Sequence, residues 1–175
     1  MKKPWFFLAL LFFVILLAGG AGAANGNFRG GNGTAAEPWQ IEDCLDLQAM
    51  NRDLGAIYVL VAPINCSGTA TWNEDPVNPG TYFGFEPIGG QFDPFAGAFD
   101  GKGFEITGLT INRVEVPFPG NGIIGLFGNI ENADLMRVKL IDVDISGNSF
   151  VGALAGASTL STILCSSSTG KVKGT

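Results

Sequence analysis

The stretch that decides the fold is Ile124-Gly125-Leu126-Phe127-Gly128, because Val151-Gly152-Ala153-Leu154-Ala155 repeats its pattern after 27 residues. Each stretch mixes small, apolar and glycine residues in the same order. A more divergent third copy lies one period upstream, at Ala98, Phe99 and Gly101. A repeat of this length is typical of proteins built from stacked structural units.

Within one repeat, apolar and acidic residues alternate along Ile141-Asp142-Val143-Asp144-Ile145. This period of two predicts a β-strand with one buried face and one solvated face. We therefore expect an all-β protein, a parallel β-solenoid (β-helix) with coils of about 27 residues. A β-sandwich would not need a fixed period, and a doubly wound fold would need strands that alternate with helices.

Stacked coils place residues one period apart in columns through the core, at the inter-strand spacing of about 4.8 Å. The spacing of 27 residues predicts that Leu109, Met136 and Ile163 form one column and that Ile111, Val138 and Cys165 form another. In this arrangement Cys165 is a small, buried apolar residue.

Residues 1–23 have the pattern of a secretory signal peptide, because Lys2 and Lys3 precede an apolar run that ends in small residues. The run is shorter than the roughly 20 residues that a bilayer span requires, so we expect no transmembrane span after cleavage. A retained membrane anchor is the alternative. Residues 24–37 are rich in Gly and Asn and are predicted to be a flexible lead-in.

Residues 38–94 are expected to form an N-terminal cap, because the open end of a solenoid exposes apolar core and unpaired backbone. Apolar residues at helical spacing predict a capping helix over 43–54, with Asp43 as its N-cap. A buried strand over 57–61 and an aromatic-rich loop over 66–94 would complete the cap. Residues 95–175 then form the solenoid repeats, and no C-terminal cap is recognisable, so we expect further repeats of the same chain beyond a truncated end.

Three cysteines occur in the chain, and Cys44 and Cys66 lie 22 positions apart. We expect a disulfide between these two, because exported proteins fold in oxidising compartments. Closing a loop of that length stabilises a fold by about 3 kcal/mol in the chain-entropy model. Two buried thiols are the alternative.

The composition excludes several kinds of function. Histidine is absent, which removes Ser-His and Cys-His nucleophile pairs and His-ligated zinc sites. Removal of Lys2 and Lys3 from the 10 basic residues leaves 8 against 16 acidic residues, a formal charge of −8. An acidic chain disfavours nucleic acid as a partner.

The repeats resemble those of the GLUG-repeat family. The resemblance is carried by Gly125-Leu126-Phe127-Gly128 and Val151-Gly152-Ala153-Leu154-Ala155-Gly156, each followed by a strand rich in Ile and Val. Upstream segments resemble the leader that precedes such repeats, among them Ile64-Asn65-Cys66-Ser67 and Gly84-Phe85-Glu86-Pro87-Ile88-Gly89.

The resemblance covers residues 38–174 and implies a bacterial or archaeal secreted or cell-surface protein. Some relatives of this kind carry the repeats beside an IgA-specific metallopeptidase domain, which would need a zinc-binding His pair. The chain departs from the family pattern at Asn65, Ala153 and Ala155.

Few side chains suggest chemistry. Asp142 and Asp144 on one strand face could contribute to a Ca²⁺ site, although a solvated face needs no ligand, so no cofactor is expected. Arg137 and Lys139 flank Val138 and could contact an acidic polysaccharide, while cleavage would need a carboxylate pair from among Asp134, Asp142 and Asp144. A solvated basic edge is the alternative. Exposed aromatic residues could stack on sugars, or could instead pack within the cap. The candidates are Trp72, Tyr82 and Phe85.

These features predict an exported, non-catalytic repeat module, either adhesive or a structural stalk. Its expected partners are surface glycans or host and matrix proteins, and its expected location is secreted or on the cell surface. A polysaccharide-acting β-helix enzyme, lyase or glycoside hydrolase, is the first alternative. An accessory region of a larger surface metallopeptidase is the second.

Overall fold

A computed structural model describes residues 27–114 and 122–174 of the chain. The predicted signal peptide over 1–23 lies outside the described residues. One α-helix, α1 (Cys44–Ala49), is followed by the 3₁₀ helices η1 (Met50–Arg52) and, later, η2 (Ser67–Thr71). The strands are β1 (Trp39–Ile41), β2 (Ile57–Leu60), β3 (Ile64–Asn65), β4 (Ala98–Asp100), β5 (Glu105–Thr107), β6 (Thr110–Arg113), β7 (Ile123–Ile124), β8 (Phe127–Glu131), β9 (Asp134–Met136), β10 (Lys139–Gly147), β11 (Phe150–Val151), β12 (Ala155–Thr159), β13 (Thr162–Leu164) and β14 (Ser167–Gly174).

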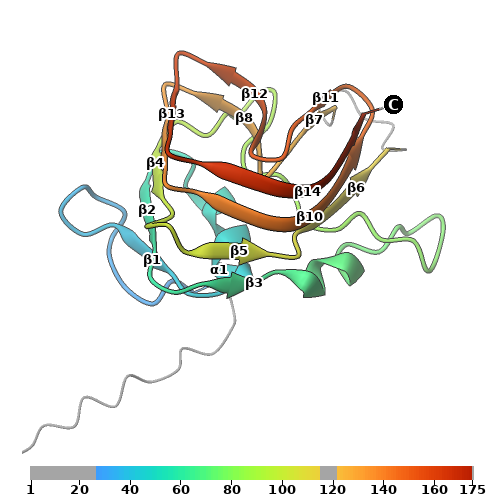
Figure 1. Cartoon of the computed structure of the whole chain (residues 1–175), viewed down its shortest axis with the longest axis horizontal. Coiled ribbons are helices and arrows are strands. Elements are labelled where there is room, and N and C mark those ends of the chain that lie inside the picture. Colours follow the sequence, from blue (N-terminus) through green and yellow to red (C-terminus); the bar gives the residue numbers. More distant parts are fainter. Residues whose placement is uncertain (1–26, 115–121, 175) are drawn as a thin grey trace, which may run out of the picture.

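The chain is all-β apart from its short helices, and its named strands pair in parallel throughout the described residues. It passes in turn through β7, β8, β9 and β10, then returns and lays β11, β12, β13 and β14 upon them in the same order. Below these layers, β4 and β5 lie on β2 and β3. The sheets therefore curl around a common core (Figure 1).

Side chains in register form columns across the layers, but not the columns expected from the sequence. Tyr58, Phe99 and Leu135 are fully buried one above another, and Ile163 continues their column. Met136 is opposite Leu164 instead of Ile163. The predicted column of Leu109, Met136 and Ile163 is therefore wrong.

The second predicted column is wrong for the same reason. Ile111 pairs with Ile145, which pairs with Val172, so neither Val138 nor Cys165 stands above it. Val138 is nevertheless fully buried in the core. Cys165 is exposed and free, contrary to the expectation that it is buried.

The error arises because the repeat is not uniform in length. Ile124 pairs with Val151 at a spacing of 27, whereas Phe127 pairs with Ala155 at a spacing of 28. The extra residue persists through β9 and the start of β10 and is lost at a register shift between Leu140 and Val143. The spacing is longer still in the layers nearer the N-terminus, since Phe99 pairs with Leu135 at a spacing of 36 residues.

The corners between strands repeat from layer to layer. Asn132 and Leu160 have φ values of 53° and 49°, and Arg137 and Cys165 both have φ values of 51°. Each pair is one layer apart, at 28 residues. Left-handed backbone costs an L-residue roughly 1–2 kcal/mol, so its recurrence at matching positions indicates that stacking imposes the same bend on successive layers.

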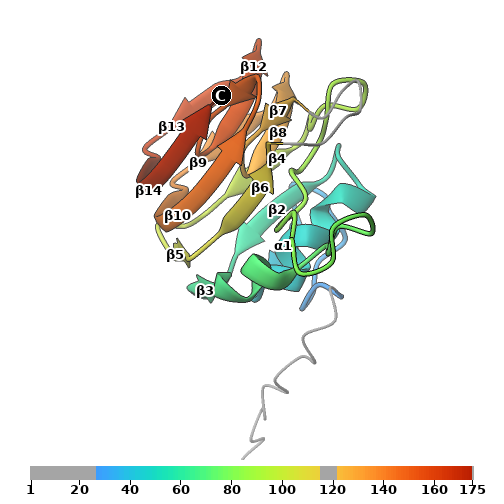
Figure 2. The same cartoon turned by 90° about the vertical axis from the view of Figure 1, so that its right-hand side faces the viewer.

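The N-terminal elements close one end of the stack, and Figure 2 shows α1 beside β2, at the end away from β13 and β14. The predicted N-cap is confirmed, since the Asp43 side chain accepts a hydrogen bond from Asp46 N. Leu47 and Met50 are fully buried and belong to the same core cluster as the repeat strands. The buried face of the helix therefore forms part of the common core.

The segment 27–37 is bound to the body of the protein, which corrects the prediction of a flexible lead-in for this part. Arg29 N donates to Gln40 O (3.0 Å), and Ile57 N donates to Gly33 O (2.8 Å). The Phe28 ring packs against Trp39, with 5.0 Å between centroids. One aromatic side chain and backbone pairing to β1 therefore order a segment whose composition alone predicts flexibility.

The opposite end of the stack is uncovered in the described part of the chain. Ile163 and Val172 are 42% and 46% exposed, although Leu135 and Ile145 beneath them are fully buried. Leu160 and Leu164 are also exposed. The last layer therefore presents core-type side chains to solvent.

A disulfide joins Cys44 at the start of α1 to Cys66 after β3, as predicted. Replacing both cysteines with Ala should lower the free energy of unfolding by about 3 kcal/mol, because the unfolded chain regains the entropy of an open loop. Urea titration measures the loss, and Cys165→Ser is the control expected to leave stability unchanged. Titration of the unfolded, unreduced protein should give one free thiol, and three thiols would contradict the assignment.

Candidate functional site

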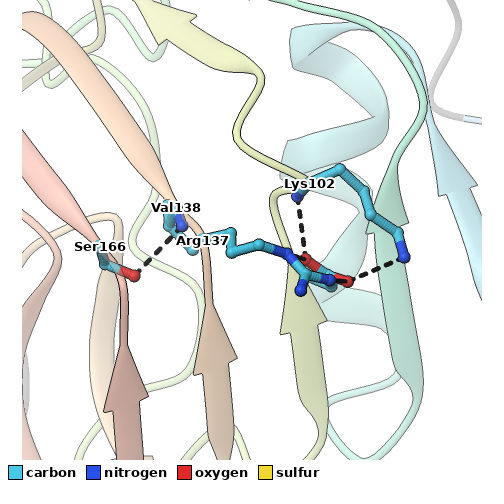
Figure 3. A network of polar contacts seen from close by, with 5 residues as sticks. Lys102, Arg137, Val138 and Ser166 are labelled. Carbon is cyan, nitrogen blue, oxygen red and sulfur yellow. Dashed lines mark hydrogen bonds and ion pairs between the residues drawn. The ribbon is translucent and has the colours of Figure 1, made fainter.

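Charged side chains at one corner of the stack connect adjacent layers. Asp100, at the end of β4, accepts hydrogen bonds at Oδ1 from Arg137 Nε (3.0 Å) and from Lys102 N (2.9 Å). Its second oxygen pairs with the guanidinium of Arg137 and with Lys102 Nζ. Figure 3 shows these contacts together with the hydrogen bond from Val138 N to Ser166 Oγ (3.1 Å) in the next layer.

Burial acts to raise the pKa of Asp100, but the hydrogen bonds from Arg137 and Lys102 outweigh it and hold the pKa below its ordinary value. On the neighbouring strand pair, Lys139 Nζ lies 2.7 Å from Glu105 Oε1. The two cations that could have formed a basic polysaccharide-binding edge are thus each paired with a carboxylate of the layer below. This arrangement is a structural tie between layers.

The candidate carboxylates are dispersed. Asp134 begins β9 in one sheet, whereas Asp142 and Asp144 belong to β10 in another. All three are exposed. Asp142 occupies a left-handed corner (φ 53°), and Asp144 pairs in register with Lys171 of β14.

The aromatic candidates for sugar stacking are mostly packed into the body. Phe85 is fully buried, and Trp72 stacks against it with 6.4 Å between centroids. Tyr82 is half-buried beside Glu74. Phe85 therefore cannot stack on a sugar, whereas Phe92, which was not among the candidates, is 77% exposed.

Neither a metal-binding group nor a membrane-spanning helix occurs in the described residues. In residues 27–114 and 122–174, no three His, Cys, Asp or Glu side chains gather as a metal-binding group. Over the same ranges, no helix has the length and apolar character needed to cross a bilayer.

Comparison with known proteins relates the chain to short segments of much longer ones. No family model matches the chain, and no solved structure matches it. It is 35% identical over 153 residues to Halomucin of Haloquadratum walsbyi, a match that covers 82% of the chain and 2% of Halomucin. It is 34% identical over 156 residues to a protein of Evansella cellulosilytica whose name describes a Gly-rich membrane protein, covering 87% of the chain and 17% of that protein.

Asp100→Asn tests whether the ion pairs of Asp100 with Arg137 and Lys102 stabilise the stack. The substitution should lower the free energy of unfolding by about 1 kcal/mol at pH 7, because a charged acceptor shared by two cations becomes neutral. Since the folded pKa lies below the unfolded value of 3.8, this stabilisation is present above that pH and is lost as the pH falls through the folded pKa.

Urea unfolding at pH 7 and near pH 3 measures the difference between the two proteins. Asp134→Asn, which changes an exposed carboxylate on the adjacent strand β9, is the matched control and should have little effect at either pH. A loss for Asp100→Asn that is equally large at both values would contradict the electrostatic account.

Proposed function

We propose that the chain is a non-catalytic module of an exported cell-surface or secreted repeat protein, and that it forms the N-terminal cap and first coils of a parallel β-solenoid. The observation that supports this most is the stack of parallel layers with left-handed corners at matching positions. In such an architecture each layer supplies the template for the next, which suits an extended stalk or adhesive surface.

The relatives support the same proposal. The names of both relatives are compatible with a place at the cell surface, and the chain spans only a small share of each. The resemblance of the Gly125-Leu126-Phe127-Gly128 stretch to GLUG repeats points the same way. Paired cations and dispersed carboxylates favour a structural or adhesive role over polysaccharide cleavage.

The proposed location can be tested in the source organism. Brief protease treatment of intact cells should remove the protein from the cell surface, or it should be recovered from the medium, with a mature N-terminus near residue 24. A protein that is retained in the cytosol with residues 1–23 intact would overturn the proposal. Incubation with acidic and neutral polysaccharides should release no new reducing ends or unsaturated products. Turnover that Asp142→Asn or Asp144→Asn abolishes would favour the enzyme instead.

The proposed solenoid predicts that the exposed edge of β14 accepts another layer. Fusing a second copy of residues 148–175 after Thr175 should raise the free energy of unfolding by a few kcal/mol, because Ile163 and Val172 become covered. The denaturant m-value should rise with the added buried surface.

The matched control is the same fusion with Asp at the added copy's counterparts of Ile163 and Val172, which should gain no stability. An added copy that stays protease-sensitive and leaves both parameters unchanged would contradict the solenoid.

A further inference from the structure

An arginine occupies a core-facing position on β6. Residues of a strand alternate between faces, so Arg113 shares the face of Ile111, which is fully buried, while Asn112 between them is exposed. The guanidinium carbon of Arg113 lies 5.9 Å from the centre of the Phe83 ring. The strand pattern therefore turns a permanent cation inward.

One donor of this cation lacks an acceptor in the described part of the chain. The Nε atom of Arg113 is buried there without a hydrogen-bond partner. Burial lowers the pKa of Arg113, while the charge of Glu86 acts in the opposite direction. Leaving a buried donor unsatisfied is costly, and more so in a charged group, so a ligand that accepts from this guanidinium would be stabilised by it.

A cavity of about 400 Å³ lies in front of this arginine, within the size range of small-molecule sites. Its lining includes two carboxylates, Glu86 and Asp93, and apolar walls from Leu54, Pro87 and Ile123. The wall near η1 is held in place because Asn51 donates to Pro87 O (3.2 Å) and accepts from Gly89 N (3.0 Å).

The charges around the cavity restrict what it can bind. The Arg113 guanidinium suits a carboxylate, which can accept two parallel hydrogen bonds. Glu86 and Asp93 would repel a phosphate or any multiply charged anion, but would attract an ammonium group. Leu54, Pro87 and Ile123 favour an apolar side chain.

We propose that this cavity, lined by Arg113, Glu86 and Asp93, binds a small zwitterionic amino carboxylate of the amino-acid type. The ligand carboxylate pairs with Arg113, the ammonium group faces Glu86 and Asp93, and an apolar side chain contacts Leu54, Pro87 and Ile123. The site lies in the N-terminal part of the stack and would be present whether or not the protein acts at a surface.

The test is an NMR titration of the ¹⁵N-labelled protein, observing the Nε–H signal of Arg113. L-leucine should shift this signal in a saturable way. The two halves of the ligand, 4-methylpentanoate without an ammonium group and isopentylamine without a carboxylate, should each bind at least about tenfold more weakly, equivalent to about 1.4 kcal/mol. Inorganic phosphate should bind no better than either half.

Variants assign the effect to residues. Two variants should each weaken leucine binding at least about tenfold: Arg113→Gln, and the double variant Glu86→Gln/Asp93→Asn. Binding to these variants is measured from the backbone amide shifts around the cavity. Arg29→Gln removes a cation that is 48% exposed and paired with Glu42, and should leave binding unchanged.

Three results would overturn the proposal: no saturable shift of the wild-type Nε–H signal with leucine, equal or tighter binding of 4-methylpentanoate or phosphate, or unchanged binding in a folded Arg113→Gln variant. Because the first two need only the wild-type protein, the proposal stays testable even if Arg113→Gln does not fold.

Discussion

Parallel backbone pairing between successive layers is the constraint on which the rest of the structure depends. The backbone of each strand forms hydrogen bonds with the layer below and with the layer above. The register of one strand pair therefore fixes which side chains meet in the core. Tyr58, Phe99 and Leu135 are buried together because of this register. The same close pairing restricts side-chain size, since Gly128 of β8 lies so close to the Gly89 carbonyl that a side chain would collide with it.

The stacking also explains why charged groups gather at one corner. Arg137 reaches Asp100 of the layer below, and Val138 beside it reaches Ser166 of the layer above, because the bends of successive layers coincide. Their contacts neutralise the half-buried carboxylate of Asp100 and satisfy the Val138 N–H group that a bend leaves without a strand partner. These polar groups therefore serve the architecture, whereas Arg113 lines a cavity and its Nε atom has no acceptor among the described residues.

The sequence predicted the kind of structure better than its register. Repetition and alternation of apolar residues correctly predicted parallel stacking of short strands, and Asp43 correctly marked the start of the helix. A gapless period of 27 missed the additional residue between Val151 and Ala155, although Leu126 over Leu154 and Gly128 over Gly156 fit a spacing of 28. Because side chains alternate along a strand, an error of one residue moves a position to the other face.

Other features could not be predicted from local sequence. The order of segment 27–37 depends on hydrogen bonds to β1 and on Phe28 packing, both of which are tertiary. Arg113 lies in a run, Thr110-Ile111-Asn112-Arg113, whose final cation would ordinarily be assigned to the surface. Its inward direction could have been noticed from its phase with Ile111, but the cavity also needs lining residues from other segments, among them Leu54 and Glu86.

The register of the stack is tested most directly by nuclear Overhauser contacts between side chains in the folded protein. The structure predicts contacts from the Phe99 ring to the Leu135 methyls and from Leu135 to the Ile163 methyls, because these residues face one another across paired strands. Contacts that instead link Leu109 to Met136 and Met136 to Ile163 would contradict the register and the layer architecture that depends on it.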